Sequence, residues 1–473
     1  MSMVKFNEIK KERFNKRDAD ERSLDFDSIY ENFIDKDMLK QASRCVKCPV
    51  DKFKDFMINP IFCKTGCPLT NRIPEWIEKT YDEDYYAAAK LSHDMSPFPE
   101  ILGRVCPKVG LCESSCNLEK SEYKAISIGE VEIFLNEKAF EDGFVPDYGK
   151  NIIKKGKVAI VGSGPASLSC ATFLLRAGVE VELFEKQDRC GGLLTYGIPN
   201  FKLPKNIVSR RIEWMKDAGM IIHTNTEVGK DVSIKSLVEG YDALFLGLGA
   251  PDGRSARIEN EYANGVYHVM HVLKAEQKII FDKNFNDSML KDKNVVVIGG
   301  GDSAMDAVRT AIRQKAKSST CIYRRDEESM PGSKSEVKNA KEEGVKFIFN
   351  QAPKKVLVDE SMNVIGLEMA KTKIELSDDG RNKLIVLDDN KSNIEVDIII
   401  LALGFDNKLF DFYKDLNLEL GKWNDISINE KQETSHKNVY AGGDVVRGAD
   451  LAVTAALDGR TAAYSIIEKL KKS

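Results

Sequence analysis

The chain has 473 residues, of which 70 are basic and 74 acidic, so its formal net charge is only −4. A charge so close to zero supplies no general attraction to a nucleic acid or an anionic membrane, and we expect neither partner. The charged first 23 residues lack an apolar core and no apolar run approaches the roughly 18 residues of a membrane span, so we expect a cytoplasmic protein. The length of the chain suggests about three domains.

Charged residues dominate positions 1–40, and apolar residues such as Phe6, Phe14 and Phe33 are scattered among them. This composition favours a solvated helical arm. The alternative is an arm that docks on another subunit, and the sequence assigns no further role to the segment.

Seven of the ten cysteines are crowded into one N-terminal segment. They are Cys45, Cys48, Cys63, Cys67, Cys106, Cys112 and Cys116. In a large chain without an export signal, this crowding favours metal ligation in a reducing compartment over disulfides. A Cys-x-x-x-Cys-Pro run, as at residues 63–68, is typical of ferredoxin-like iron–sulphur binding. A zinc site built from the first four cysteines is the alternative.

Seven cysteines are one ligand short of two four-iron clusters, so a ligand of another type would complete the pair. A helical pattern from Ile126 to Phe140 follows the last of these cysteines and carries Glu130 and Glu132. Spacing alone does not choose between the two carboxylates.

A glycine-rich turn follows the apolar strand expected at residues 157–161, and a helical pattern follows the turn. Glycines there permit a tight turn and a close approach to a pyrophosphate, which the helix N-terminus stabilises. The next strand ends at Glu185, 23 residues after Gly162, where an acid can bind an adenosine ribose. The alternative is an ordinary turn between strand and helix. The candidate dinucleotide-binding residues are Gly162, Gly164, Pro165, Ala166, Ser167 and Glu185.

A second glycine-rich turn of the same kind follows the strand expected at residues 295–298, and its candidate residues are Gly300, Gly301, Asp302, Ser303 and Ala304. The strand after it ends in Arg324 and Arg325, 25 residues after Gly299, where the first unit has an acid. Guanidinium groups there would bind a ribose 2′-phosphate, so NADPH is favoured over NADH. The alternative is an exposed basic pair that forms ion pairs with the acids at 326–328.

Other segments contribute candidate cofactor contacts. A glycine-punctuated loop at residues 191–199 could lie against a flat ring, although a plain surface loop is the alternative. A strand that stops at Asp444 places an acid where it can bind ribityl hydroxyls, and an ordinary helix cap is the alternative. The helix expected from about residue 451 to 470 can stabilise negative charge on a reduced flavin. These segments supply Gly192, Leu193, Gly443, Asp444 and Thr454, and a further buried strand expected at residues 397–405 supplies Gly404.

Several stretches together resemble the small (beta) subunits of bacterial NADPH-dependent glutamate synthases. They include Arg44-Cys-Val-Lys-Cys48, Leu111-Cys-Glu-Ser-Ser-Cys116, Gly191-Gly-Leu-Leu-Thr-Tyr-Gly-Ile-Pro199, Tyr323-Arg-Arg-Asp-Glu-Glu-Ser-Met-Pro-Gly332 and Ala441-Gly-Gly-Asp-Val-Val-Arg-Gly448. The resemblance implies FAD on the first Rossmann unit, NADPH on the second, and two [4Fe-4S] clusters in a helical N-terminal domain. We therefore expect an α/β fold with a helical domain at 1–150, an FAD-binding domain at 151–285 and 393–473, and an inserted NADPH-binding domain at 286–392.

The resemblance also suggests the eighth ligand. The related domain of dihydropyrimidine dehydrogenase uses a Gln three positions after an Ile-Gly pair, and the match falls on Glu132. We expect one cluster on Cys45, Cys48, Cys63 and Cys116 and the other on Cys67, Cys106, Cys112 and Glu132. One departure is the 14 residues between Cys48 and Cys63, where the family usually has four, and it weakens the case for Cys63.

The implied function is electron input to glutamate synthase. A hydride would pass from NADPH to FAD and single electrons through the clusters to the large (alpha) subunit, where 2-oxoglutarate and glutamine-derived ammonia become glutamate. Because this chemistry belongs to the cofactors, we expect no catalytic acid or base. The alternatives are a subunit that supplies ferredoxin or a pyrimidine dehydrogenase, and a non-catalytic zinc-binding assembly subunit.

Overall fold

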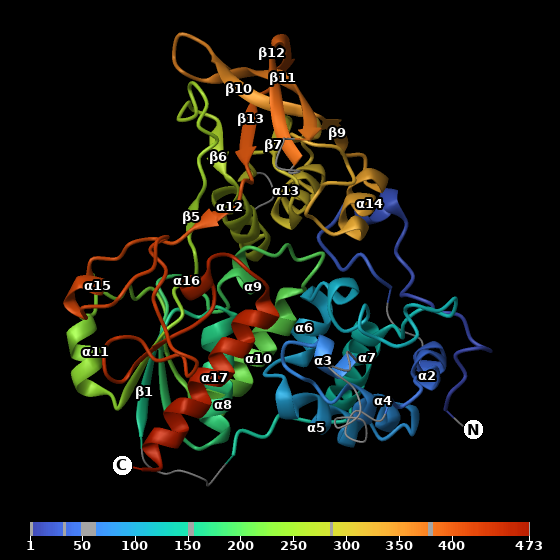
Figure 1. The fold of residues 1–473 in the computed structure, drawn as a ribbon, viewed down its shortest axis with the longest axis vertical. Helices are drawn as coiled ribbons and strands as arrows, with labels where there is room; N and C mark the ends of the chain where they lie inside the picture. The colour runs from blue at the N-terminus through green and yellow to red at the C-terminus, as the bar shows by residue number, and fades with distance from the viewer. Residues whose placement is uncertain are drawn as a thin grey trace.

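The computed structural model describes residues 3–31, 35–48, 63–149, 156–283, 287–376 and 382–472. Figure 1 shows three parts, namely a group of N-terminal helices, a unit built on one parallel sheet beside them, and a unit built on a second parallel sheet above both. None of the helices in the described ranges combines the length and apolar character that a membrane crossing needs.

Short helices make up the N-terminal part. They are α1 (Ala19–Arg22), α2 (Asp35–Ser43), α3 (Cys63–Gly66), α4 (Ile73–Tyr81), α5 (Tyr85–Met95), α6 (Pro99–Val105), the 3-10 helix η1 (Lys108–Gly110) and α7 (Ile128–Glu141). In α4, Ile73, Trp76 and Ile77 recur at helical spacing and are buried, while Pro74 occupies the first turn, where its missing N–H is not needed. Asp84 caps α5 through its side chain. Helical periodicity and capping therefore set these elements.

The first sheet has the strand order β15-β4-β1-β2-β3, and all of its neighbouring strands are parallel. These strands are β1 (Lys157–Val161), β2 (Glu180–Phe184), β3 (Ile221–His223), β4 (Ala243–Leu246) and β15 (Val439–Ala441). Alternate residues of β1 enter the apolar cores on the two faces of the sheet. One core takes in α8 (Pro165–Arg176), α10 (Lys205–Asp217) and α17 (Ala452–Leu470), and the other takes in α11 (Ile234–Gly240) and α15 (Phe412–Asp415). Helices therefore cover both faces, as a parallel sheet requires.

The close packing of α17 on α8 depends on a glycine. A Cβ at Gly459 would lie 1.9 Å from the carbonyl oxygen of Ala166, a separation that no side chain can adopt. Ser169 Oγ in α8 donates a hydrogen bond of 2.6 Å to the carbonyl oxygen of Ala456 in α17. The C-terminal helix is therefore fixed against the helix that follows the first glycine-rich turn.

The second sheet has the order β6-β13-β7-β8-β9 and is also parallel. Its strands are β6 (Val266–His268), β7 (Asn294–Ile298), β8 (Ser318–Tyr323), β9 (Lys346–Phe349) and β13 (Ile398–Leu401), accompanied by α12 (Val269–Asp282), α13 (Asp302–Arg313) and α14 (Lys334–Glu342). An antiparallel sheet of β10 (Gln351–Val358), β11 (Val364–Leu376) and β12 (Asn382–Glu395) lies at the top of Figure 1. The predicted α/β class with one unit inserted in the other is confirmed, because β15 and α17 return to the first unit after the second is complete.

The second sheet extends beyond the predicted limits of the inserted domain, 286 and 392. Strand β6 lies before residue 286 and β13 lies after residue 392, yet β13 pairs with both β6 and β7. We therefore propose that the inserted domain extends beyond these limits to include β6 and β13; the three-residue strand β6 gives no clear sequence signal. A short antiparallel pair, β5 (Asp252–Gly253) with β14 (Phe405–Asp406), joins the two connecting segments, and we propose that the chain crosses between the units there.

The N-terminal segment is not the predicted solvated helical arm. Between residues 3 and 31, α1 is its only helix. Three basic side chains of this segment, those of Lys11, Arg13 and Arg22, form ion pairs with carboxylates elsewhere in the chain. Arg13 forms ion pairs with Glu113 at 2.8 Å and Glu130 at 3.1 Å among the N-terminal helices. Lys16 Nζ donates a hydrogen bond of 2.6 Å to Asn339 Oδ1 on α14, in the second unit. Contacts between distant segments therefore override the local helical tendency.

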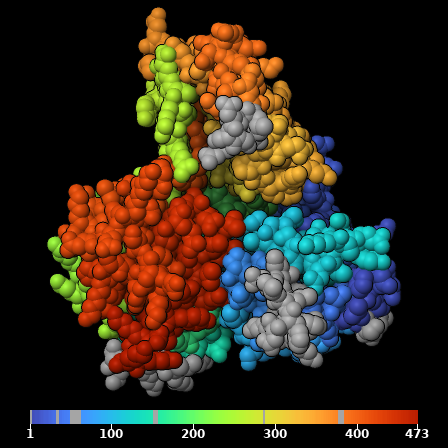
Figure 2. All heavy atoms as spheres, in the orientation of Figure 1, coloured from blue at the N-terminus to red at the C-terminus, as the bar shows by residue number. Residues whose placement is uncertain are grey.

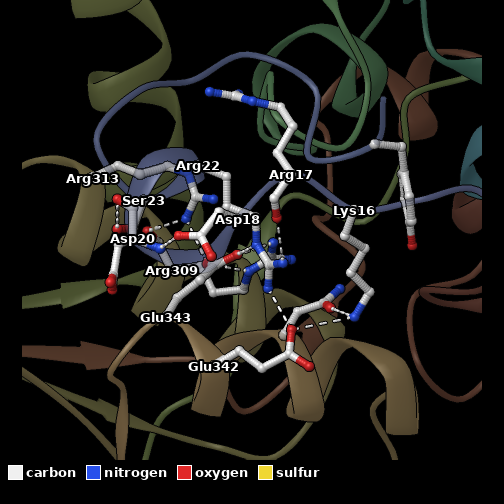
Figure 3. A network of polar contacts seen from close by, with 12 residues as sticks. Lys16, Arg17, Asp18, Asp20, Arg22, Ser23, Arg309, Arg313, Glu342 and Glu343 are labelled. Atoms are coloured by element: carbon white, nitrogen blue, oxygen red, sulfur yellow. Dashed lines mark hydrogen bonds and ion pairs between the residues drawn. The ribbon is translucent and has the colours of Figure 1, made fainter. Parts of the chain in front are cut away.

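Figure 3 shows how Arg22 is held in that second unit. Its guanidinium, 2% exposed, donates to Glu343 Oε1 at 3.0 Å and to Glu342 Oε2 at 2.6 Å. The Glu343 carboxylate also accepts hydrogen bonds from Arg309 at 2.8 Å and Arg313 at 2.7 Å. Burial opposes ionisation, but the hydrogen bonds from Arg309 and Arg313 outweigh it and lower the pKa of Glu343 to about 2. Residues 3–31, called the arm from here on, therefore connect the N-terminal helices to the second unit through a buried ionic network.

The first unit also contacts the N-terminal helices directly. Figure 2 shows the C-terminal part of the chain, in red, packed beside these helices, in blue. Arg460 on α17 donates hydrogen bonds to the carbonyl oxygens of Leu69 at 3.0 Å and Met95 at 2.7 Å. All three parts of the molecule are therefore in mutual contact.

Candidate functional site: two nucleotide turns and two cysteine cavities

The first glycine-rich turn lies between β1 and α8. Gly162 has a φ of +88°, and a Cβ there would lie 2.4 Å from the carbonyl oxygen of Gly247, so the position requires glycine. A Cβ at Gly164 would meet no atom within 4 Å, which leaves open space in front of α8. Pro165 begins α8, and Ala166 and Ser167 continue its first turn. Space in front of a helix N-terminus suits a pyrophosphate, so the predicted residues fit this group.

Glu185 lies at the end of β2 and is buried beside this turn. Its Oε2 accepts a hydrogen bond of 2.5 Å from Ser163 Oγ, and Oε1 accepts one of 2.8 Å from the amide of Gln187. Ser163 Oγ in turn accepts a hydrogen bond of 3.0 Å from the amide of Gly191. Sequence reasoning missed Ser163, although it stands between the two turn glycines. This serine links the predicted ribose-binding acid to the glycine-punctuated loop.

That loop lies directly against the glycine-rich turn. Gly192 has a φ of +53°, and a Cβ there would lie 2.8 Å from the Cα atom of Gly164. Leu193 follows as the first residue of α9 (Leu193–Tyr196) and is partly exposed. The structure therefore brings two predicted cofactor-binding segments together.

The C-terminal candidate residues lie beside the start of α8, the helix that follows the first glycine-rich turn. Gly443 has a φ of +80°, and a Cβ there would lie 3.0 Å from the Cβ of Ala166. Asp444 begins α16 (Asp444–Arg447), and burial raises the pKa of its carboxyl group to about 6. Thr454 lies in the first turn of α17. Sequence reasoning missed buried Asp458, which forms an ion pair with Arg447 and accepts a 2.8 Å hydrogen bond from the amide of Gly443.

The second glycine-rich turn repeats this arrangement between β7 and α13. A Cβ at Gly299 would lie 2.2 Å from the carbonyl oxygen of Ala402, and one at Gly300 would lie 2.6 Å from the ring of Tyr323. A Cβ at Gly301, directly before α13, would meet no atom within 4 Å. Asp302, Ser303 and Ala304 form the first turn of α13. Both turns therefore leave open space in front of a helix N-terminus.

Arg324 and Arg325 directly follow β8 in the same unit. In the part of the chain that the structure describes, neither guanidinium forms a hydrogen bond or ion pair, whereas Glu327 pairs with Lys341 at 2.6 Å and Glu328 with Lys334 at 3.6 Å. Glu327 and Glu328 therefore pair with lysines, whereas the pKa of Asp326 is lowered by its hydrogen bonds with Ser329 and, to a smaller extent, by the charge of Arg325. Gly404, with a φ of +95°, lies at the crossing between the two units, next to Arg254.

Two cavities gather the predicted cluster ligands among the N-terminal helices. Four thiols line the first cavity, and they belong to Cys45, Cys48, Cys63 and Cys116. Three thiols and a carboxylate line the second, and they belong to Cys67, Cys106, Cys112 and Glu132. Ile128 lines both cavities, so they are neighbours. Cys63 begins α3 and lies with its predicted partners, although the whole insertion before it, residues 49–62, is outside the described residues.

The two glutamates on α7 have different surroundings. Glu132 lines the second cavity, and its Oε1 accepts hydrogen bonds from Asn71 at 2.9 Å and Ser92 at 3.3 Å. Glu130 instead forms an ion pair with Arg13 of the arm. Only Glu132 therefore stands among the thiols, which agrees with the choice that the resemblance implies.

The chemistry of the donors fits metal clusters. Burial raises the pKa of the Cys45 thiol to about 12 and that of the Glu132 carboxyl group to about 8. Buried thiols of this kind become stable thiolates when a metal supplies positive charge. In the described ranges no three Cys, His, Asp or Glu side chains are arranged around a single metal ion, and the eight predicted ligands surround wider cavities instead.

Family models and relatives agree with these sites. Residues 156–459 match the pyridine nucleotide-disulphide oxidoreductase family, and residues 22–144 match dihydropyrimidine dehydrogenase domain II, 4Fe-4S cluster. The match to a 4Fe-4S domain decides against the zinc alternative. The structure of Mycobacterium tuberculosis FprA in complex with NADPH covers 67% of this chain and 85% of its own with a TM-score of 0.56, and at 18% identity it shows the fold alone.

The chain is 41% identical over 459 residues to the glutamate synthase [NADPH] small chain of Escherichia coli strain K12, with 95% of each chain covered. It is 37% identical to the small chain of Azospirillum brasilense, covering 96% of this chain and 93% of that one. Another E. coli protein, the oxidoreductase AegA, is 40% identical over 95% of this chain and 68% of its own. The chain therefore belongs to the family of glutamate synthase small chains, NADPH-dependent flavin oxidoreductases with an iron–sulphur domain.

Proposed function

We propose that this chain is the electron-input subunit of a cytoplasmic glutamate synthase and holds FAD, NADPH and two [4Fe-4S] clusters. When bound, NADPH supplies a hydride, FAD accepts it, and the clusters carry single electrons. The first glycine-rich turn, Glu185 and Asp444 would bind FAD, while the second turn with Arg324 and Arg325 would bind NADPH. Each cluster would take the four ligands that line one cavity.

The observation that carries this proposal is the position of the second cavity. Val453, in the first turn of α17, lines it together with Cys67, Cys106 and Cys112. The same helix turn is the one expected to face the flavin, so the second cavity lies next to the proposed flavin site. The first cavity adjoins the second across Ile128. This order supports a path from flavin to second cavity to first cavity.

The first test uses the purified holoenzyme. We expect flavin, and iron and labile sulphide in the amounts that two four-iron clusters require. NADPH should bleach the flavin absorbance and support reduction of an artificial acceptor. A protein that holds flavin but whose spectrum NADPH leaves unchanged would contradict the proposal.

The acceptor is proposed from the relatives, because glutamate synthase small chains are named as parts of a larger enzyme. A pull-down from the native cell should recover a large (alpha) subunit, and the complex should form glutamate from NADPH, glutamine and 2-oxoglutarate. Recovery of a different acceptor with no glutamate formed would refute this part of the proposal.

A second candidate is electron supply to ferredoxin or a pyrimidine dehydrogenase subunit. The 40% identity to AegA, whose name assigns only an oxidoreductase, is almost the same as the 41% identity to the glutamate synthase small chain of the same organism. Overall identity therefore does not separate the acceptors. The same pull-down decides between them, since the two candidates predict different proteins bound to this chain.

A further inference from the structure

Two residues that line the second cavity each carry a buried hydrogen-bond donor that has no partner among the residues the structure describes. The donors are Trp76 Nε1 and Ser96 Oγ, whose residues are 0% and 1% exposed. A buried polar group without a hydrogen bond is costly, so native proteins rarely leave one unsatisfied. Both residues line the same cavity, which suggests that whatever occupies the cavity accepts the hydrogen bonds of the two donors.

Both side chains are held rigidly. Trp76 lies on the buried face of α4 between Ile73 and Ile77, so its ring cannot turn towards solvent. Ser96 directly follows α5, and Arg460 of α17 donates a 2.7 Å hydrogen bond to the carbonyl oxygen of the preceding residue, Met95. The two donors therefore come from different helices that the fold fixes around the cavity.

The other polar side chains around the two cavities already have protein partners. Asn71 and Ser92 both donate to Glu132 Oε1. In the first cavity, Asn117 Nδ2 donates a 3.1 Å hydrogen bond to Cys48 Sγ. Trp76 and Ser96 differ from these groups because, within the described ranges, no thiol or carboxylate accepts a hydrogen bond from them.

We propose that Trp76 Nε1–H and Ser96 Oγ–H donate hydrogen bonds to sulphur atoms of the iron–sulphur cluster in the second cavity and thereby raise its reduction potential. This inference rests on the proposed function, in which that cavity holds a [4Fe-4S] cluster. Donors that face the sulphurs stabilise the reduced cluster more than the oxidised one, because reduction adds negative charge. The two residues would therefore make this cluster a better acceptor of electrons from the flavin.

The test removes each donor while keeping its shape. Trp76→Phe keeps an aromatic ring but deletes the N–H, and Ser96→Ala deletes the hydroxyl. Trp423→Phe is the matched control, because Trp423 is 71% exposed and does not line the cavity. Iron and labile sulphide are measured first on each holoenzyme, and a redox titration followed by electron paramagnetic resonance then gives the midpoint potentials.

We expect one of two potentials to become more negative in Trp76→Phe and in Ser96→Ala, and more so in the double variant, while the other potential and the control stay unchanged. A tenfold change in the one-electron equilibrium constant corresponds to about 59 mV, and we expect a shift of up to this size for each donor. Exchange into deuterated water should also change the hyperfine couplings of the reduced cluster in the parent, and each variant should lose one of these couplings.

Two contrary results are distinguishable. If the variants keep both clusters and both potentials match those of the parent, the inference is wrong and the proposed function stands. The parent is also compared with Cys106→Ala, which removes one proposed ligand of the second cavity. If every cluster signal of the parent persists in Cys106→Ala, the proposed function itself is wrong and the inference fails with it. If Trp76→Phe loses its cluster, Ser96→Ala alone decides the inference, since it removes only one oxygen atom.

Discussion

Replacing Arg22 with methionine should loosen the N-terminal arm from the second unit. The substitution keeps an apolar stem of similar length but removes the guanidinium that binds Glu343 and Glu342. A hydrogen bond between buried charged groups contributes about 1.5–3 kcal/mol. The bond to Glu342, whose side chain is 32% exposed, adds at most about 1 kcal/mol. Glu343 keeps its bonds from Arg309 and Arg313, so no buried charge is left unpaired.

We therefore expect the free energy of arm detachment to fall by about 2 kcal/mol, or roughly 30-fold in the opening equilibrium. Hydrogen exchange is the suitable assay, because a chain of several units with bound cofactors does not unfold in a single step. The amide of Arg17 donates to the carbonyl oxygen of Ile29 at 3.0 Å, and the amide of Ile29 donates to that of Phe201 at 3.3 Å. Both amides should exchange roughly 30-fold faster in Arg22→Met.

Lys40→Met is the matched control for this prediction, because it also removes one positive charge but from an exposed ion pair with Asp37. Its exchange at the arm should equal that of the parent. Low pH tests the same network: the folded pKa of Glu343 is about 2 and its unfolded value is about 4.5, so its contribution to stability is full above pH 4.5 and is lost as the pH falls from 4.5 to 2. If Arg22→Met and the parent exchange within about threefold of each other, the arm is not held by this network and the reasoning is refuted.

The remaining predictions concern the cofactors and α17. Replacing Arg324 and Arg325 together with serine should weaken NADPH binding by several kcal/mol at most and leave NADH unchanged, as measured by the KM for each nucleotide; equal losses for both would contradict the assignment. Glu132→Ala should halve the bound iron, whereas Glu130→Ala should retain it, and iron analysis of both variants checks the difference. Gly459→Ala should speed hydrogen exchange of the α17 amides, because its Cβ would lie 1.9 Å from a backbone oxygen; exchange equal to that of the parent would mean that α17 can shift freely.

Local steric rules explain why the sequence predicted the two nucleotide turns. At Gly162 and Gly299 the backbone lies so close to the end of a neighbouring strand that a Cβ would clash with it. Only glycine fits, so the sequence has a glycine at a fixed position between strand and helix. The grouping of eight ligands into two sets came from the ferredoxin rule that a cysteine before proline often serves the other cluster, and Glu132 came from the family resemblance. The structure brings the same two sets together, but spacing along the chain did not distinguish Glu130 from Glu132.

Other features depend on contacts that have no local signal. The arm reads as helical and solvated because its apolar and charged residues alternate irregularly, yet Arg22 binds a carboxylate 321 residues away. Asp458 is one acid among many in the sequence, and only the fold brings it to the amide of Gly443. The three-residue strand β6 is likewise recognisable only through its pairing with β13.

Helix α17 explains how one element can fix the flavin unit relative to the second cavity. Its first turn supplies Val453 to the cavity wall, and Gly459 brings the helix backbone against α8. One residue later, Arg460 holds the carbonyl oxygens of Leu69 and Met95 beside the cavity. A shift of α17 along α8 would meet the Ala166 carbonyl and break both hydrogen bonds at once. In the proposed function electrons pass between the flavin and the second cavity, and the close packing at Gly459 and the bonds of Arg460 would both keep the separation between these two sites constant.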